Sequence, residues 1–273
     1  MSTSTTCCMR SNPMHAELAA ARANWRYQPA QTVLDGRTIL ITGAGDGIGR
    51  CAALTCAAYG ANVVLLGRNQ AKLDAVFDEI VTTTHTDPTI VPCDLEGATL
   101  EAYAELNTQV MDHYGRLDGL LHNASMLGPR VPLEFYDATS WLRVMQVNVS
   151  AVFLLTQGLL PALRHSADAS VVITSSSVGR AGRAYWGAYA VSKFAAEGFA
   201  QVLADELAHE GRIRVTTLNP GATRTTMRTA AYPAEDPTTV PTPESRMDIY
   251  LYLLGPDARG RNEIQWDARD WQP

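Results

Sequence analysis

Six short apolar runs alternate with helical patterns along most of the chain, and this alternation constrains the fold more than any other feature. The runs are rich in Val, Ile, Leu and Thr, and they cover residues 38–42, 62–66, 89–92, 117–122, 170–174 and 213–218. Nearly continuous apolar strands that are each followed by a helix are typical of a parallel sheet buried on both faces. Right-handed crossovers then make the sheet doubly wound. With a seventh strand expected near 263–266, the pattern predicts an α/β fold of about seven strands.

No internal repeat and no linker rich in Pro and Ser divides this alternation, so residues 32–273 are expected to form a single domain. Residues 1–31 are rich in Ser, Thr, Ala and Asn and precede the first strong strand pattern. They are interpreted as an N-terminal extension that is mobile or packed on the surface, with a short helical pattern at 16–24. The Pro-rich stretch 232–243 is interpreted as a loop over the rim of the sheet.

The composition argues against several classes of protein. A formal net charge of −6 without a basic run does not suit a nucleic-acid-binding protein, because such proteins neutralise phosphates with clustered cations. Five cysteines without a CxxC pair or a zinc spacing indicate free thiols and no metal site. The first 30 residues lack a secretion signal, and no uninterrupted apolar run reaches the length of about 18 residues expected of a membrane helix. We therefore expect a soluble, cytoplasmic protein with neither a membrane nor a nucleic-acid partner.

A glycine-rich turn follows the first expected strand directly. Residues 42–49 read Thr-Gly-Ala-Gly-Asp-Gly-Ile-Gly, and a helical pattern continues from 50 to 59. Glycines let the backbone turn tightly and approach a pyrophosphate, whose charge meets the exposed N–H groups at the start of the helix. The position between strand and helix favours a dinucleotide site over a purely structural turn, and it makes the expected sheet Rossmann-type. The expected cofactor contacts in the turn are Gly43, Gly45, Asp46, Gly47, Ile48 and Gly49.

The end of the second expected strand indicates which dinucleotide binds. Gly67 stands where a carboxylate would bind the adenosine ribose of NAD, and Arg68 follows it. An arginine there can pair with the 2′-phosphate of NADP, and a charged hydrogen bond of about 1.5–3 kcal/mol favours NADP by roughly ten- to a hundredfold. The predicted cofactor is therefore NADP. NAD stays open if Arg68 only caps the strand in solvent.

Tyr189 and Lys193 are four residues apart on an expected helix that continues to about residue 208. This spacing places the phenol and the ammonium on one face, where the cation can favour the ionised tyrosinate. Ser176 precedes Tyr189 by thirteen residues and ends the fifth expected strand, where a hydroxyl can hydrogen-bond a carbonyl oxygen that is about to be protonated. Its two neighbouring serines leave the choice of hydroxyl open. Tyr185 has no such cation and is expected to be a pocket wall.

Together these motifs resemble the short-chain dehydrogenase/reductase family, over about residues 38–255. Ser176, Tyr189 and Lys193 resemble its catalytic trio, and Asn148 resembles its helix asparagine. Asp94 resembles its adenine-contacting acid, and residues 123–124 match part of its NNAG motif. The resemblance assigns further cofactor contacts to Asp94, Leu95, Asn123, Ala124, Tyr189, Lys193, Pro220, Gly221, Thr223 and Thr225.

Within the family, several segments are most similar to the YciK-like bacterial oxidoreductases, among them residues 46–50, 65–69 and 186–195. Two positions depart from the NNAG motif, because His122 replaces its first Asn and Ser125 replaces its Gly. A lone His at a strand end is expected to pack or hydrogen-bond rather than to act in catalysis. Asp46 stands where many NADP-using relatives carry a basic residue, which leaves the predicted NADP preference to Arg68.

The residue chemistry and the resemblance imply one reaction, hydride transfer between NADP(H) and a carbonyl or alcohol substrate, with Tyr189 as the general acid/base. Ser176 would polarise the substrate oxygen, and Lys193 would lower the pKa of Tyr189 and bind the nicotinamide ribose. Asn148 would position a water that returns the proton through Lys193. Two alternatives stay open: a non-catalytic NADP-binding sensor or scaffold, and a lyase or isomerase on the same fold.

The sequence leaves the substrate open, because loops vary independently of the fold. Apolar residues in the loops fit either a pocket wall or ordinary packing: Met126, Leu127, Tyr185, Trp186 and Met227. Loop arginines fit either an acidic or acyl-carrier substrate or plain solvation: Arg130, Arg180, Arg183, Arg224 and Arg228. The resemblance also implies a homodimer or homotetramer, packed through the helices expected around 97–115 and 138–164 or 187–208.

Overall fold

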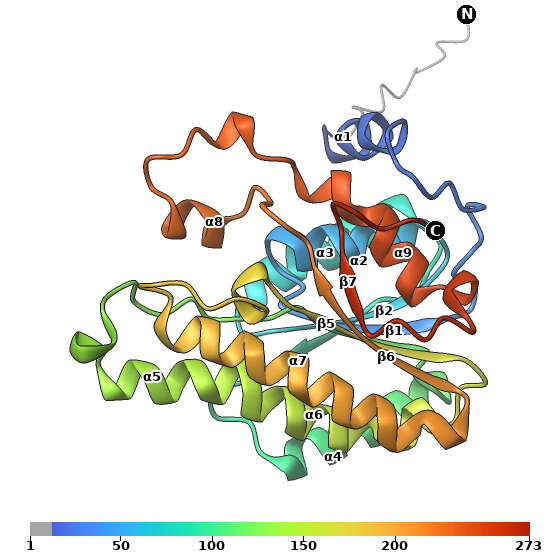
Figure 1. Ribbon diagram of the computed structural model, residues 1–273. Helices are drawn as coiled ribbons and strands as arrows, with labels where there is room; N and C mark the ends of the chain where they lie inside the picture. Colours follow the sequence, from blue (N-terminus) through green and yellow to red (C-terminus); the bar gives the residue numbers. More distant parts are fainter. Residues whose placement is uncertain (1–12) are drawn as a thin grey trace, which may run out of the picture.

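Seven parallel strands form one sheet in the order β3-β2-β1-β4-β5-β6-β7 in the computed structural model, which describes residues 13–273 (Figure 1). Each strand begins and ends within two residues of its expected range. The ranges were predictable because a strand in a sheet that is covered on both sides carries apolar side chains on both of its faces. The strands are β1 (Thr38–Thr42), β2 (Asn62–Gly67), β3 (Thr89–Pro92), β4 (Gly119–His122), β5 (Ala169–Thr174), β6 (Ile213–Asn219) and β7 (Gln265–Asp267). The predicted doubly wound α/β fold is confirmed.

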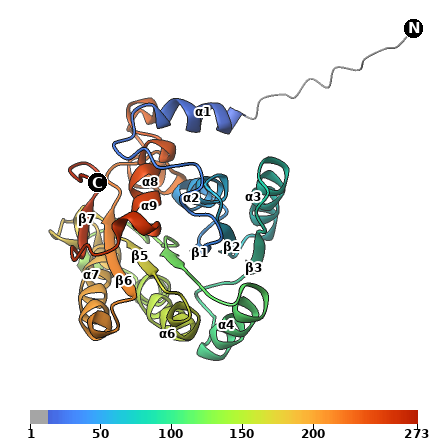
Figure 2. The same ribbon diagram turned by 90° about the vertical axis from the view of Figure 1, so that its right-hand side faces the viewer.

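Two helical layers cover the sheet (Figure 2). One layer contains α2 (Gly47–Ala58), α3 (Gln70–Thr83) and α9 (Met247–Leu254), and the other contains α4 (Leu100–Tyr114), α6 (Ala151–Arg164) and α7 (Gly187–Leu207). Successive residues of β1 show why both faces are apolar: Ile39 and Ile41 pack into the core of the first layer, and Leu40 packs into the core of the second.

The order of the strands reverses between β1 and β4. The chain proceeds outward from β1 to β3 and then returns to place β4 on the other side of β1, where Ile41 pairs with Leu121. The connections that follow β1 and β4 run to opposite faces of the sheet. Their divergence opens a crevice at the carboxyl ends of these strands. The glycine-rich turn after β1 and the segment after β4 both lie at this crevice.

The remaining elements surround this crevice or lie on the outside of the layers. A π-helical turn, η2 (Gln146–Ser150), joins α5 (Ala138–Met145) to α6, and α8 (Thr226–Ala231) follows β6. Short turns of 3₁₀-helix are η1 (Leu133–Phe135), η3 (Ser177–Gly179), η4 (Ala208–Glu210), η5 (Pro237–Thr239), η6 (Pro243–Arg246) and η7 (Pro256–Ala258). The stretch 138–164 is long and apolar enough to span a membrane by length and composition. Here it lies in a helical layer, where Leu155 and Leu159 are buried in the core.

The N-terminal segment begins with α1 (Pro13–Arg22), near the helix expected at 16–24, and then crosses the outside of the α9 layer. Trp25 and Tyr27 are buried in the core cluster on that face, and the indole Nε1 of Trp25 donates to the carbonyl oxygen of Glu244 at 2.9 Å. Within the described residues, this part of the predicted extension therefore packs on the domain. Residues 1–12 of the extension lie outside the described residues, and the domain boundary at residue 32 stays a prediction.

Candidate active site

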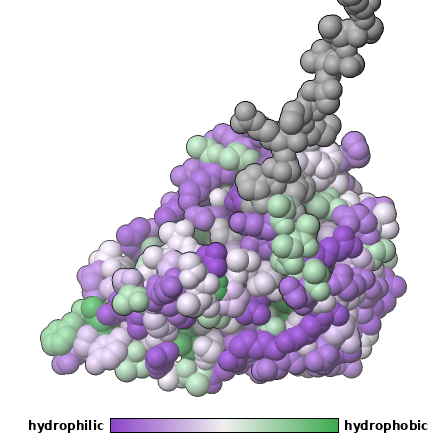
Figure 3. All heavy atoms as spheres, turned by 90° about the horizontal axis from the view of Figure 1, so that it is seen from above, coloured by the Kyte–Doolittle hydropathy of each residue, from purple (hydrophilic) through white to green (hydrophobic). Residues whose placement is uncertain are grey.

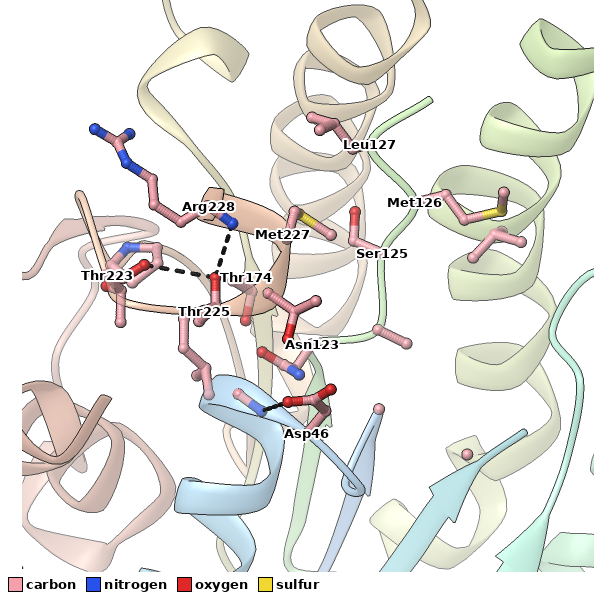
Figure 4. Close-up of a pocket in the computed structure, with 18 of the residues that line it drawn as sticks. Asp46, Asn123, Ser125, Met126, Leu127, Thr174, Thr223, Thr225, Met227 and Arg228 are labelled. Carbon is pink, nitrogen blue, oxygen red and sulfur yellow. Dashed lines mark hydrogen bonds between the residues drawn. The ribbon is translucent and has the colours of Figure 1, made fainter. Parts of the chain in front are cut away.

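The glycine-rich turn connects β1 to α2 in a conformation that side chains would obstruct. Gly43 has φ +68°, and a Cβ on it would lie 3.1 Å from Cα of Ala124. A Cβ on Gly49 would lie 2.2 Å from the carbonyl oxygen of Gly43. The turn therefore leaves room for a phosphate to approach the backbone at the start of α2, as the predicted pyrophosphate site requires. Asp46 caps this helix, because its carboxylate accepts from the N–H of Gly47 at 2.7 Å (Figure 4).

A pocket of about 560 Å³ extends from this turn along the carboxyl ends of the strands. It collects nearly all of the predicted cofactor contacts into one cavity, although they come from segments far apart in the sequence. Gly49 is the exception among them, since it lies beneath the turn rather than in the lining. The predicted residues in the lining are Gly43, Gly45, Asp46, Gly47, Ile48, Arg68, Asp94, Leu95, Asn123, Ala124, Ser176, Tyr189, Lys193, Pro220, Gly221, Thr223 and Thr225.

The end of the pocket beside β2 contains two cations rather than one. Arg68 is exposed in the pocket lining, as predicted. Lys72, in the first turn of α3, also lines the pocket, and its Nζ lies 2.5 Å from Oδ2 of Asp46. This hydrogen bond from Lys72 holds the pKa of Asp46 below its usual value. Lys72 was not predicted as a cofactor contact from the sequence, although its position four residues after Arg68 was an available signal.

The loop after β6 closes the opposite side of the pocket. Gly221 donates its N–H to Oδ1 of Asn219 at 3.1 Å, and Thr225 caps α8 by accepting from the N–H of Arg228 at 3.1 Å (Figure 4). Thr223 and Thr225 therefore lie in a loop whose path is fixed by its own hydrogen bonds. The loop places α8 directly over the catalytic side chains, where Ala231 and Tyr189 belong to one small apolar cluster.

The predicted catalytic side chains lie together at the start of α7 and the end of β5. Ser176 and Tyr189 both line the pocket, and Ser176 acts to lower the pKa of the phenol, which agrees with the choice of the middle serine. The neighbouring Ser175 points elsewhere and donates to Glu197 at 2.5 Å. Lys193 donates from Nζ to the carbonyl oxygen of Thr174 at 2.7 Å, and Nζ lies 5.5 Å from the centre of the Tyr189 ring.

Burial controls the protonation of this pair. Desolvation raises the pKa of Tyr189 to about 12, although the hydrogen bond with Ser176 acts in the opposite direction. Desolvation also lowers the pKa of Lys193 to about 8, against the field of Glu197. The expected net lowering of the Tyr189 pKa is therefore not found, because burial of the phenol, which is only 8% exposed, outweighs the interactions that would lower it. A phenol that retains its proton is suited to donating one.

Asn148 lies in the π-helical turn η2, and its amide makes three hydrogen bonds. Its Oδ1 accepts from the N–H of Met126 at 2.8 Å, and its Nδ2 donates to the Met126 carbonyl and to Oγ of Ser192, both at 2.9 Å. Such π-turns often mark functional sites because they redirect one side chain of a helix. Asn148 thereby links the segment after β4 to α7. Its predicted contact with a water stays a prediction.

Two other candidate residues have structural positions. His122 is buried at the end of β4, where its Nε2 lies 2.8 Å from Oγ1 of Thr156 and burial lowers its pKa to about 3. A neutral, enclosed imidazole agrees with the expected packing role. Tyr185 was expected to be a pocket wall, but it is 57% exposed and lies outside the pocket lining. Its neighbour Trp186 forms that wall instead.

Glu197 is a buried carboxylate that the sequence interpretation missed. It lies one turn after Lys193 on α7 and is only 4% exposed. It accepts hydrogen bonds from four side chains that end or flank β5, β6 and β7. The donors are Ser175 at 2.5 Å, Thr217 at 2.7 Å, Gln265 at 2.9 Å and Arg180 at 3.1 Å. The only signal for Glu197 in the sequence was its spacing of four positions from Lys193, which places both side chains on one face of the helix.

The fold and the pocket define a dinucleotide-binding α/β protein, and comparison with known proteins identifies its family. Residues 37–236 match the family model of the short chain dehydrogenases, and the chain belongs to that family.

The relatives agree with the predicted similarity to YciK. The chain is 51% identical over 243 residues to the oxidoreductase YciK of Escherichia coli (strain K12), covering 89% of this chain and 96% of that protein. A short chain dehydrogenase of Shigella flexneri complexed with NADP has a TM-score of 0.86 at 50% identity, with 88% of this chain and 100% of that one covered. One from Escherichia coli CFT073 complexed with NADPH has a TM-score of 0.85 at 51% identity, covering 89% and 100%.

Proposed function

We propose that this protein is an NADP(H)-dependent oxidoreductase that interconverts a carbonyl compound and its alcohol, with Tyr189 as the general acid/base. The observation that carries the proposal is that Ser176, Tyr189 and Lys193 line one pocket together, with Tyr189 and Lys193 buried. The alternative of a sensor or scaffold gives no reason to bury a lysine and a tyrosine beside a serine hydroxyl. The family match supports oxidoreductase chemistry in general.

Each residue has a distinct task in the proposed reaction, which is carbonyl + NADPH + H⁺ → alcohol + NADP⁺. When bound, NADPH supplies the hydride that the carbonyl carbon accepts. Tyr189 donates its phenolic proton to the substrate oxygen, and Ser176 hydrogen-bonds the same oxygen. Lys193 places a positive charge beside the phenol as its proton leaves. Asn148 holds the segment after β4 in place through Met126, and we retain its predicted water contact as part of the proposal.

The charge beside β2 supports NADP over NAD. Arg68 and Lys72 both line this end of the pocket, and Asp46 neutralises only one of the two cations. The net positive charge suits a 2′-phosphate, which forms strong charge-assisted hydrogen bonds with guanidinium and ammonium groups. Similar proteins from Shigella flexneri and Escherichia coli contain NADP and NADPH in their structures. Because Asp46 is paired with Lys72, Arg68 remains the cation available to the phosphate.

Removal of the Tyr189 hydroxyl tests the proposal. Tyr189→Phe keeps the ring in its apolar cluster but removes the proton, so turnover should fall by at least about a hundredfold. The dissociation constant for NADPH, measured by the change in its fluorescence on titration, should stay unchanged. Tyr185→Phe is a matched control, because Tyr185 is exposed and lies outside the pocket lining.

The same experiment separates the alternatives. Full turnover in Tyr189→Phe would contradict the assigned role. NADPH binding without oxidation of NADPH by any carbonyl compound would favour the sensor or scaffold. Formation of product without net oxidation of NADPH would favour the lyase or isomerase.

We also propose that the protein is a soluble, cytoplasmic homodimer or homotetramer. Large apolar side chains are exposed on the layer formed by α5, α6 and α7: Phe153 is 47%, Phe194 45% and Val202 59% exposed. Figure 3 also shows hydrophobic side chains at the tip of the molecule where η1 lies. Large apolar side chains that are exposed on one layer are typical of an association site.

A charge placed on this layer tests the association. Phe194→Asp should shift the wild-type oligomer toward smaller species in sedimentation velocity, because the partner would bury an unpaired carboxylate. Val81→Asp is the control, since Val81 is similarly exposed at 51% but lies on α3 in the opposite layer. An unchanged sedimentation profile for Phe194→Asp would place the interface elsewhere.

A further inference from the structure

The pocket beyond the catalytic side chains has walls that are mostly apolar and aromatic. Met126 and Leu127 come from the segment after β4, and Trp186 precedes α7. Met227 and Tyr232 come from α8 and the residue that follows it. Figure 4 shows the side chains of Met227 and Ser125 facing each other across this space. Leu127, Met227 and Tyr232 also pack against the cluster that contains Tyr189, so the apolar wall extends to the reacting hydroxyl.

Arg228 is the loop arginine that lines this end of the pocket, and its charge is already matched. Its guanidinium donates to Glu235 through two nitrogens, at 2.6 and 2.5 Å, and lies 3.8 Å from the centre of the Tyr232 ring. In Figure 4 the guanidinium points away from Met227 and Ser125. A bidentate arginine–carboxylate pair of this geometry has little capacity left for a second carboxylate.

The other loop arginines hold the loops together and lie outside the pocket lining. Arg130 donates to the carbonyl oxygen of Ala231 and stacks over the rings of Trp186 and Tyr232 at 4.6 and 5.1 Å. Arg180 pairs with Glu197. Of the two remaining arginines, Arg183 donates to the Tyr232 hydroxyl at 3.2 Å, and Arg224 donates to the Thr238 carbonyl at 3.4 Å and interacts with the charge of Asp236. These contacts explain the arginines without an acidic substrate.

In the lining at this end of the pocket, the polar atoms that lack a partner are neutral. Among the described residues, Oγ of Ser125 and Nε1 of Trp186 are buried without a hydrogen bond, and both residues line the pocket. Nε of Arg130 is also buried without a partner, but Arg130 lies outside the lining. Trp186 is only 7% exposed. A hydroxyl and an indole N–H can hydrogen-bond an uncharged polar group, but neither compensates the desolvation of a full negative charge.

We infer that the substrate is an uncharged aldehyde or ketone with an apolar or aromatic body, and that the site disfavours carboxylated carbonyl compounds. This inference rests on the proposed function and decides between the two readings of the loop arginines. The reaction is R–CHO + NADPH + H⁺ → R–CH₂OH + NADP⁺ for an aldehyde, so the proton, the hydride and both electrons are accounted for. A carboxylate on R would lie against methionine, tryptophan and tyrosine, and the two arginines stacked on those rings are already engaged, Arg228 by Glu235 and Arg130 by the Ala231 carbonyl.

A matched pair of aldehydes tests the inference. Benzaldehyde and para-carboxybenzaldehyde share the ring and the reacting group and differ by one carboxylate. We expect kcat/KM for benzaldehyde to exceed that for para-carboxybenzaldehyde by at least about tenfold, the equivalent of about 1.4 kcal/mol. Calorimetric titration of the NADP⁺-loaded protein with benzyl alcohol and para-carboxybenzyl alcohol should show the same preference without turnover. Equal or better use of the carboxylated aldehyde would overturn the inference and leave the proposed function intact.

A variant that releases Arg228 sharpens the test. Glu235→Gln removes the carboxylate that occupies the guanidinium, while Glu235 itself lies outside the pocket lining. The preference for benzaldehyde over para-carboxybenzaldehyde should then shrink, because Arg228 becomes free to pair with the substrate. A preference that stays unchanged in Glu235→Gln would show that charge matching at Arg228 does not set the substrate class. Oxidation of NADPH by carboxylated carbonyl compounds but by no uncharged aldehyde or ketone would overturn this inference alone, whereas oxidation by no carbonyl compound, in protein that binds NADPH, would overturn the proposed function as well.

Discussion

At the scale of single residues, Lys193 has the property that an experiment can follow most directly. Its ammonium is buried and its pKa falls to about 8, whereas Tyr189, with a pKa of about 12, keeps its proton to much higher pH. The charged form of Lys193 is present below about pH 8 and is lost above it. Carbonyl reduction at saturating NADPH should therefore proceed at a constant rate on the acid side and slow as the pH rises through about 8.

The profile of kcat against pH checks this prediction. Lys193→Arg is the informative variant, since a guanidinium keeps its charge throughout the accessible range. If this variant retains turnover, its alkaline decline should move to higher pH or disappear. An identical decline in both proteins would assign the titration to another group.

At the scale of elements, Glu197 connects Ser175 after β5, Thr217 in β6 and Gln265 at the start of β7 to the helix that carries Lys193. Glu197→Gln keeps the shape of the side chain but leaves Arg180 without its carboxylate. Because breaking a buried pair costs about 3 kcal/mol, the free energy of unfolding should fall by about that amount in urea titrations. The variant should also lower the pKa of the alkaline decline in kcat, because the field of Glu197 raises the pKa of Lys193.

The pH profile of kcat separates an effect of Glu197 on Lys193 from an effect on overall stability alone. Glu206→Gln is a matched control on the same helix, where Glu206 is exposed and its charge has no such contacts. It should change neither the free energy of unfolding nor the pH profile. A Glu197→Gln protein that loses stability but keeps the wild-type pH profile would contradict the electrostatic link to Lys193.

Elements and residues whose signals are local in the sequence could be predicted. The strands of a doubly covered sheet carry apolar side chains on both faces, and the glycine turn and the Tyr189–Lys193 spacing each lie within one short segment. β4 starts later than expected because Leu117 donates to Ala162, which lies outside the sheet. Lys72 and Glu197 were missed because their partners are distant in sequence: Asp46 for Lys72, and residues such as Thr217 of β6 and Gln265 of β7 for Glu197. The raised pKa of Tyr189 results from its burial, and the spacing between Tyr189 and Lys193 in the sequence gives no information about burial.

At the scale of the whole molecule, the N-terminal segment connects parts that are distant in sequence. Trp25 binds the carbonyl of Glu244, and the N–H of Arg26 donates to Asp248 at 3.0 Å at the start of α9. The guanidinium of Arg26 donates to the carbonyl of Trp271 at 2.9 Å, near the other end of the chain. The loop that begins at Tyr232, beside the pocket, ends at Glu244. The N-terminal segment therefore also anchors the far end of this loop.

Replacement of Trp25 tests this arrangement. Trp25 is 6% exposed and packs against Tyr59, with 6.2 Å between ring centres, so Trp25→Ala should lower the free energy of unfolding by about 3 kcal/mol. Trp25→Phe keeps most of the apolar area and loses the hydrogen bond to Glu244, so it should cost only about 1 kcal/mol. Urea unfolding of both variants measures the difference. A segment that is not packed on the domain in solution would leave the two variants as stable as the wild type, because neither side chain would then be buried.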